Sequence, residues 1–256
     1  EIKLIADLHT HTFFSHGKGS IEANSREALK KNLNTIAITD HGLGHIIRGI
    51  TRTEVRLARK QVDKLNKQLQ GKLRIILGVE ANIVSLDGTI DLPESMWDYF
   101  DIVLVGYHPI ARFKHMSDLF KMYIRNALPR RQNSVVERNT YAYIKAIERY
   151  KIDILAHPGL MMPLDIQMVA QVANAYNTVL EINSKHLIMD AAQVEIAAHE
   201  GAYFAINSDA HSPADVGEFA SGIAIAETAR LKSEQIINTA EGNAFVLRNG
   251  FKLKEG

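Results

Sequence analysis

Short apolar runs alternate with longer amphipathic segments along this chain of 256 residues, and this alternation limits what the chain can fold into. Each run has four to six residues and is rich in Ile, Val and Leu, which is typical of strands that are buried in a parallel sheet. The predicted strands are Lys3–Leu8, Thr35–Thr39, Arg74–Val79, Asp101–Val105, Asp153–Ala156, Thr178–Ile182 and Tyr203–Ile206.

The segments between these runs are predicted to be helices. The clearest one covers Thr51–Gln70, where apolar residues recur every three or four positions and so share one face. Thr51 and Glu54 have the spacing of a capping box at its start, and Gly71 suits its end. The other predicted helices are Ser20–Asn32, Asn133–Tyr150, Asp165–Tyr176, Asp190–Glu200 and Leu231–Asn249.

Strands that alternate with helices predict an α/β architecture, either a barrel or an open doubly wound sheet with helices on both faces. No Gly/Ser-rich or Pro-rich linker divides the chain, so we expect a single domain over residues 1–256. A long basic excursion, at about residues 112–138, follows the fourth predicted strand. It is either a solvated surface segment or a loop over the active site that attracts an anionic substrate.

Composition excludes several classes of function. The chain has 30 Lys and Arg against 29 Asp and Glu, and a net charge of +1 argues against a general polyanion-binding surface. It has no cysteine, which rules out a disulfide scaffold, a thiolate zinc site and a cysteine nucleophile. We also expect no membrane span and no signal peptide. These features together predict a cytoplasmic protein.

Histidine or carboxylate residues stand at the carboxyl ends of six of the seven predicted strands. His9 and His11 are two apart, so they should share a face, together with Asp7. In a parallel barrel all the carboxyl ends open on one face, where active sites lie. The groups that should converge there are His9, His11, His16, His41, Glu80, His108, His157, Asp209 and His211.

Imidazole and carboxylate ligands together suit Zn²⁺, Mn²⁺ or Fe²⁺. Nine groups are too many for one tetrahedral ion, so they predict two or three divalent metals that share a bridging carboxylate. His199 is expected near the negative end of a helix. His45, His115 and His186 are expected on the surface, with the mouth of the site as the alternative. The chain has no G-x-S-x-G turn for a serine triad and no phosphate-loop or dinucleotide fingerprint.

Five motifs at the strand ends belong together. They are Asp7-Leu8-His9-Thr10-His11-Thr12, Thr39-Asp40-His41-Gly42, Gly78-Val79-Glu80, His157-Pro158-Gly159 and Asn207-Ser208-Asp209-Ala210-His211. In combination they resemble the PHP (polymerase and histidinol phosphatase) superfamily, over Ile2 to about Gly250. Amidohydrolases also carry a His-x-His pair but usually add a lysine on the fourth strand, and TatD-type nucleases lack the Thr-Asp-His and Asp-Ala-His elements. The resemblance implies a distorted seven-stranded βα (TIM-like) barrel with a cluster of two or three metals.

The resemblance also divides the candidate ligands into three sets, one for each metal. The sets are His9, His11, Glu80 and Asp209 for the first metal, Glu80, His108 and His157 for the second, and His16, His41 and His211 for the third. Glu80 would bridge the first two metals.

Within the superfamily the chain looks most like the stand-alone phosphatases of the YcdX type, although its interval between His108 and His157 is longer. The implied reaction is hydrolysis of a phosphate ester by a metal-activated water, with Asp209, His157 and Glu80 at the catalytic centre. Asp209 would accept the proton of the water or orient it.

Other residues are predicted to have supporting roles. Arg112, Arg130 and Arg131 are candidates for binding the substrate's phosphate, because guanidinium suits bidentate contacts with anions. Asp7 and Asp40 either orient imidazoles or form plain structural pairs.

Three alternative functions stay open at this point. They are a histidinol-phosphate phosphatase, a nuclease or nucleoside-bisphosphate phosphatase that uses the basic excursion, and a non-catalytic binding module that metals stabilise. The expected partner is a small phosphorylated substrate. Nucleic acid is less favoured, and the resemblance allows a homo-oligomer.

Overall fold

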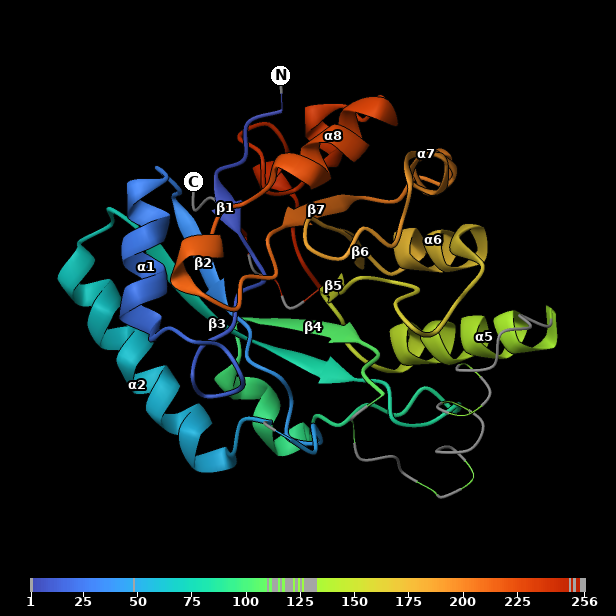
Figure 1. Cartoon of the computed structure of the whole chain (residues 1–256), viewed down its shortest axis with the longest axis horizontal. Helices are drawn as coiled ribbons and strands as arrows, with labels where there is room; N and C mark the ends of the chain where they lie inside the picture. The colour runs from blue at the N-terminus through green and yellow to red at the C-terminus, as the bar shows by residue number, and fades with distance from the viewer. Residues whose placement is uncertain are drawn as a thin grey trace.

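The computed structural model of the protein describes residues 2–47, 49–109, 111, 115, 117, 122, 124, 126, 133–248, 250 and 252–253. Across these residues, seven parallel strands form one sheet in which each strand pairs with the next one in the chain (Figure 1). The strands are β1 (Ala6–Asp7), β2 (Thr35–Ile38), β3 (Arg74–Asn82), β4 (Ile102–Gly106), β5 (Ile154–Leu155), β6 (Val179–Asn183) and β7 (Phe204–Asn207).

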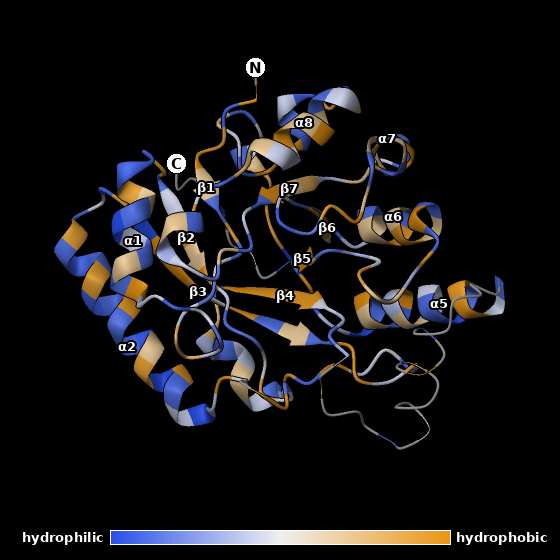
Figure 2. Cartoon of the chain, viewed as in Figure 1, coloured by the Kyte–Doolittle hydropathy of each residue, from blue (hydrophilic) through white to orange (hydrophobic). Residues whose placement is uncertain are grey.

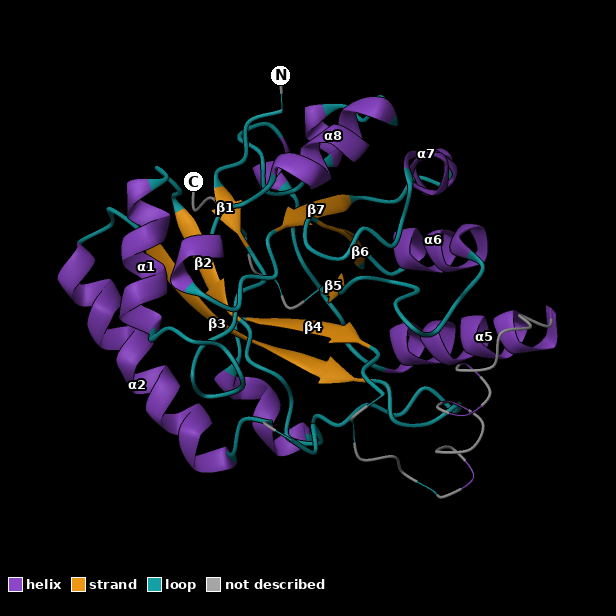
Figure 3. Cartoon of the chain, in the orientation of Figure 1, coloured by secondary structure: helices purple, strands orange, loops and turns teal. Residues whose placement is uncertain are grey.

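Helices connect the strands and surround them on the outside, as Figure 3 shows. The α-helices are α1 (Ile21–Lys30), α2 (Arg52–Leu69), α5 (Asn133–Arg149), α6 (Ile166–Ala175), α7 (Ala191–His199) and α8 (Ala220–Thr228). Short 3-10 helices are η1 (Glu94–Tyr99), η3 (Pro213–Asp215), η4 (Ser233–Gln235) and η5 (Gly242–Ala244). Among the described helices, none has both the length and the hydrophobicity that a membrane span needs.

The predicted strands are confirmed, with small shifts at their ends. β3 continues three residues beyond the predicted Val79, which brings Glu80 and Asn82 into the sheet opposite Leu104 and Gly106 of β4. β1 and β5 are shorter than predicted, with two residues each in regular pairing.

Local signals at the helix ends are also confirmed. Thr51 and Glu54 form the predicted capping box of α2, with the Glu54 carboxylate accepting from the Thr51 backbone at 2.8 Å. The helix ends where Gln70 and Gly71 take positive φ angles of 47° and 79°.

The predicted helix over Leu231–Asn249 is wrong. Within it, Ile236 bridges to β7, and the Ile237 backbone donates to the Phe204 carbonyl at 2.8 Å. Ile236, Ile237 and Leu247 of this segment are buried, and tertiary hydrogen bonds replace those of a helix. A helix that the sequence did not signal, α8, precedes it; its N-cap position, Phe219, makes no capping bond through its side chain.

The sheet closes nearly completely into a barrel, and Asn238 holds the closure at the amino-terminal end. Its amide donates to the Ala6 carbonyl at 2.9 Å and the Ile206 carbonyl at 2.7 Å, and its oxygen accepts from the Ile206 backbone at 3.1 Å. At the other end, the His11 backbone donates to the Ala210 carbonyl at 2.8 Å. β1 and β7 are therefore linked at both ends, and the alternative of an open doubly wound sheet is not formed.

The strands bury two separate apolar clusters. The larger one includes Ile36 and Leu77 and packs against the helices, whereas the smaller one includes Ala37 and Ile76. Among the described residues, the smaller cluster takes members from all seven strands or the residues next to them, and none from the α-helices, so it fills the barrel interior. In Figure 2, β4 is orange along most of its length while α2 alternates between orange and blue, as expected for a buried strand and a surface helix.

We expect Asn238→Ala to lower the free energy of unfolding by roughly 3 kcal/mol, because buried backbone groups of β1 and β7 lose their partner. Urea unfolding measures this loss. Gln61→Ala, which removes an exposed amide on α2, is the matched control and should stay within about 0.5 kcal/mol of the wild type. Equal stability of the two variants would contradict this role for Asn238.

Candidate metal centre

All nine predicted ligands lie at the carboxyl end of the barrel. Glu80 is within β3, and the others lie in the loops that follow β1, β2, β4, β5 and β7. His9, His11, His41, Glu80, His157 and Asp209 are buried, His108 and His211 are half-buried, and His16 is exposed. A buried group of imidazoles and carboxylates at this end has the makeup of a metal site.

The first set of ligands converges on one point. His9 Nε2 lies 3.1 Å from His11 Nε2 and 3.4 Å from Glu80 Oε2. His11 Nε2 lies 3.3 Å from Asp209 Oδ1. The ligand atoms of His9, His11 and Asp209 fall within 4.8 Å of one another, which is compact enough for one cation.

Glu80 lies between this set and a second one. Its Oε1 is 2.8 Å from His157 Nε2 and 3.5 Å from His108 Nε2, while its Oε2 is 2.8 Å from His41 Nδ1. The two carboxylate oxygens therefore face different imidazoles. A carboxylate in this position is suited to bridging two cations.

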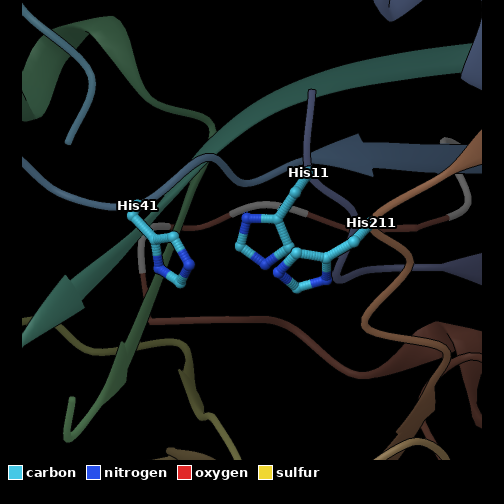
Figure 4. Close-up of side chains that lie close together, drawn as sticks. All are labelled: His11, His41 and His211. Atoms are coloured by element: carbon cyan, nitrogen blue, oxygen red, sulfur yellow. The ribbon is translucent and has the colours of Figure 1, made fainter. Parts of the chain in front are cut away.

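The third set adjoins His11, whose ring centroid lies 4.4 Å from that of His41 and 4.3 Å from that of His211. His11, His41 and His211 point into a common space, with ligand atoms within 4.8 Å of one another (Figure 4). The His16 ring stacks on His41 with centroids 4.6 Å apart, and lies 4.3 Å from His211. His41 thus belongs with Glu80 and His108 as well as with the set that the resemblance gave it.

Several buried polar atoms of this cluster have no hydrogen-bond partner among the described residues. They include His11 Nδ1, His157 Nδ1 and His41 Nε2, and Glu80 Oε2 lies 2.8 Å from His41 Nδ1 without the geometry of a hydrogen bond. An unsatisfied buried polar atom is costly, and a bound cation would compensate such nitrogen and oxygen donors. The residues present therefore fit a divalent metal cluster.

The protonation states also suit metal binding. Burial alone would raise the pKa of Glu80, but His108, His9 and His41 hold that pKa well below its usual value. Burial and the neighbouring His41 hold the pKa of His11 well below its usual value, and burial with the same neighbour lowers the pKa of His16 to about 4. Charged carboxylates and neutral imidazoles are the forms that bind metals.

His157 and His9 are the exceptions among the ligand imidazoles. Burial alone would lower the pKa of His157, but its hydrogen bond to Glu80 and the charge of Glu80 raise that pKa above its usual value. The same holds more strongly for His9. Burial alone would lower its pKa, but Glu181, Glu80 and Asp209 hold that pKa well above its usual value. In the absence of a metal, a protonated His9 compensates this group of carboxylates.

Two buried side chains orient the ligands, and the sequence did not predict either. Glu181 of β6 accepts from His9 Nδ1 at 2.7 Å and from the His157 backbone at 2.7 Å. Asn82 Oδ1 lies 2.7 Å from His108 Nδ1, and Asp91 holds both the amide and the backbone of Asn82 at 2.7 Å. These contacts occupy Nδ1 of His9 and His108 and leave Nε2 of both rings available to bind a metal. The one available signal was a charged residue inside the sixth apolar run.

Asp7 and Asp40 form structural pairs and do not contact the rings. Asp7 accepts from Ser208 Oγ at 2.5 Å and from the Gly217 backbone at 2.9 Å. Asp40 accepts from the hydroxyls of Thr12 and Ser15. The expectation that Asp7 shares a face with His9 and His11 is wrong, because the regular pairing of β1 ends at Asp7 and the alternation is not maintained.

The mouth of the site contains three residues beyond the predicted ligands. His45, expected on the surface, is 8% exposed and its ring stacks on His41 with centroids 4.6 Å apart. His186 Nε2 lies 3.6 Å from Asp209 Oδ2, and Lys185 Nζ lies 2.6 Å from His211 Nδ1. For His45 and His186 the alternative placement at the mouth therefore holds.

The remaining expectations concern two histidines away from the site and three arginines of the basic excursion. His115 is exposed and His199 lies in the last turn of α7, both as expected. Arg112, Arg130 and Arg131 lie outside the described residues, as does most of the basic excursion at 112–138.

The backbone takes unusual conformations where the ligands lie close together. His157 and Asp209 have positive φ angles of 30° and 52°, which side-chain-bearing residues rarely adopt. Gly106 leaves room for a ring, since a Cβ there would lie 2.7 Å from His157 Cε1. The loops are thus held in costly conformations that bring the ligands together.

Comparison with known proteins identifies the family. A model of the PHP domain matches residues 7–199. The chain belongs to the PHP domain family. It is 33% identical over 254 residues to a probable phosphatase of Caldanaerobacter subterraneus subsp. tengcongensis, covering 94% of this chain and 89% of that protein. It is 31% identical over 256 residues to a probable phosphatase of Thermoanaerobacter sp., covering 94% and 93% of the two chains.

Two solved structures share the fold of this PHP domain protein. One is a histidinol phosphate phosphatase from Lactococcus lactis complexed with zinc, L-histidinol and phosphate, with a TM-score of 0.60, 13% identity and coverage of 90% and 94%. The other is a putative histidinol phosphatase from Listeria monocytogenes, with a TM-score of 0.62, 17% identity and coverage of 84% and 98%. At these identities the likeness concerns the fold alone.

We expect Glu181→Gln to weaken metal binding about 10- to 100-fold, because the amide cannot accept every hydrogen bond that the carboxylate now receives. Titration with a competing chelator measures the affinity. Glu195→Gln, on the exposed side of α7, makes the same chemical change away from the site and should bind metal as the wild type does. Wild-type affinity in Glu181→Gln would show that this carboxylate does not support the ligands.

Proposed function

We propose that this PHP domain protein is a metal-dependent phosphatase that hydrolyses small phosphate monoesters. The observation that carries the proposal is the position of Glu80, whose two oxygens face different imidazoles at 2.8 Å each. Family membership supports it, and so do the relatives named probable phosphatase.

The nine ligands would form three sets that hold two or three divalent cations. The proposed sets are His9, His11, Glu80 and Asp209, then Glu80, His108 and His157, then His16, His41 and His211. Zn²⁺, Mn²⁺ and Fe²⁺ all suit this mixture of donors. When bound, such cations neutralise phosphate oxygens and make water acidic enough to act as a nucleophile near neutral pH.

Asp209 is the residue of this chain best placed to handle the proton of the attacking water. Burial alone would raise the pKa of Asp209, but the charge of His9, a hydrogen bond from His11 and the charge of His11 hold that pKa well below its usual value, so the carboxylate stays ionised and can accept a hydrogen bond from the water. Its Oδ2 accepts from Asn183 at 3.3 Å and lies beside His186, which fixes its orientation.

Positive charge at the mouth favours an anionic substrate. Lys185 Nζ lies 3.9 Å from Asp209 Oδ1 and close to His211, at the edge of the third ligand set. An ammonium group in this position attracts a phosphate and can donate to one of its oxygens. Lys185 is therefore a further candidate for binding the phosphate.

We expect His157→Asn and Asp209→Asn each to fold and to lose at least about 100-fold in kcat/KM, because each removes a proposed ligand. Asn suits the positive φ at position 209. Phosphate release is measured over a panel of histidinol phosphate, sugar phosphates and nucleotides, with Zn²⁺, Mn²⁺ or Fe²⁺. His199→Asn, on the surface of α7, is the control and should keep full activity. Full activity of both site variants would overturn the assignment.

The same panel, extended by short oligonucleotides, separates the alternatives. Activity confined to oligonucleotides, falling steeply with salt, would point to a nuclease. Bound metal without turnover of any ester would point to a binding module.

Removal of metal should lower both activity and stability. With free metal at about 100 times its Kd, binding to the folded state contributes about 2.7 kcal/mol for one site, which corresponds to roughly 5–10 °C in Tm for a chain of this size. Differential scanning fluorimetry before and after chelation measures the shift, and readdition of metal should restore both properties. An unchanged Tm and unchanged activity after complete chelation would contradict a metal-dependent enzyme.

A further inference from the structure

Four large apolar side chains are strongly exposed around the mouth of the site. They are Ile46 (63%), Ile47 (65%), Met161 (56%) and Leu187 (55%), and we call them the apolar rim. Within the described part of the chain, no other large apolar side chain is more than half exposed. All four lie in loops that follow β2, β5 and β6, at the carboxyl end of the barrel where the ligands converge.

A row of imidazole rings connects the two sides of the rim. His45 lies 5.9 Å from His108, His108 lies 5.1 Å from His157, and His157 lies 6.1 Å from His186, as measured between ring centroids. Ile46 follows His45 in the chain, and Leu187 follows His186. The rim residues therefore stand at the two ends of a row that crosses the candidate metal centre.

Two features indicate that the rim is more than incidental surface. Met161 has a positive φ of 53°, a conformation that disfavours a residue with a side chain, and yet its side chain is exposed. Loops usually carry polar residues at such positions, whereas exposed apolar residues gathered in one place mark a binding site. Other exposed apolar side chains, such as Leu57 and Ile196, lie on outer helices, while the less exposed Phe13 lies in the loop after β1 at the same end of the barrel as the rim.

We propose that the apolar rim binds the organic group of the substrate, so that the enzyme prefers phosphate monoesters whose leaving group is apolar. The inference rests on the proposed function. With the phosphate at the metal centre beside Lys185, the ester oxygen would face outward and its organic group would contact the rim. In the reaction the bond from phosphorus to the ester oxygen breaks, a bond from phosphorus to the water oxygen forms, and a proton of the water passes to the leaving alcohol.

The test is a series of ethyl, butyl and hexyl phosphate with the metal-loaded enzyme. These leaving groups have nearly the same chemistry, so differences in kcat/KM report contacts with the chain. Burial of one methylene is worth up to about fourfold, and we expect kcat/KM to rise at least about tenfold from ethyl to hexyl phosphate. Affinities of the matching alkylphosphonates, measured by calorimetry, should rise in parallel without any turnover.

Variants show whether the rim causes this preference. The double variant Ile46→Ser with Ile47→Ser, and separately Leu187→Ser, should lower the ratio of hexyl to ethyl kcat/KM by about threefold or more. Leu57→Ser on α2 and Ile196→Ser on α7 expose a hydroxyl in place of an apolar group away from the site, and they should keep the wild-type ratio. All five positions are exposed, so a thermal melt suffices to confirm folding.

Failure of this inference can be told apart from failure of the proposed function. Equal kcat/KM for ethyl and hexyl phosphate would overturn the rim proposal and leave the phosphatase intact. Absence of turnover on every ester would overturn the proposed function. The affinities of the alkylphosphonates would then show on their own whether the rim binds apolar groups. A dimer that the rim variants dissociate, with no dependence on chain length, would assign the rim to a contact between copies of this chain and overturn the proposal.

Discussion

The centre of this structure depends on one buried carboxylate. Glu80 is fully buried in β3, and its charge is held there by imidazoles that approach both of its oxygens. An unpaired carboxylate in such a place would be very costly, so the surrounding histidines are required by electrostatics. Because those histidines come from separate loops, Glu80 also ties the carboxyl ends of the strands to one another.

A second layer of contacts gives these rings their orientation. Glu181 fixes His9 and the backbone at His157, while Asp91 fixes Asn82, which in turn fixes His108. Glu181 and Asn82, which contact the ligand rings, are themselves held by further hydrogen bonds. A site built in this way is organised before a metal arrives, which favours tight and selective binding.

The residues that stabilise the barrel and the candidate metal ligands lie in different parts of its interior. Apolar residues such as Ala37, Ile76 and Ile102 fill the barrel interior, and Asn238 links β1 to β7. Toward the carboxyl end the interior becomes polar, and residues such as His157 and Asp209 take unfavourable backbone conformations. Packing of the apolar interior offsets the cost of assembling so many titratable groups at the carboxyl end of the barrel.

Sequence patterns predict the seven strands, most helix boundaries and the candidate ligands. These depend on short-range signals, namely apolar runs, capping residues such as Thr51, and histidines or carboxylates at strand ends. The family resemblance already implied a barrel, but the structure was needed to identify the contacts that close it, to show that residues 231–249 form no long helix, and to place Glu181 and His45 in the site. These features depend on contacts between residues far apart in the chain, such as Asn238 with Ala6 and Glu181 with His9, which local sequence patterns do not encode.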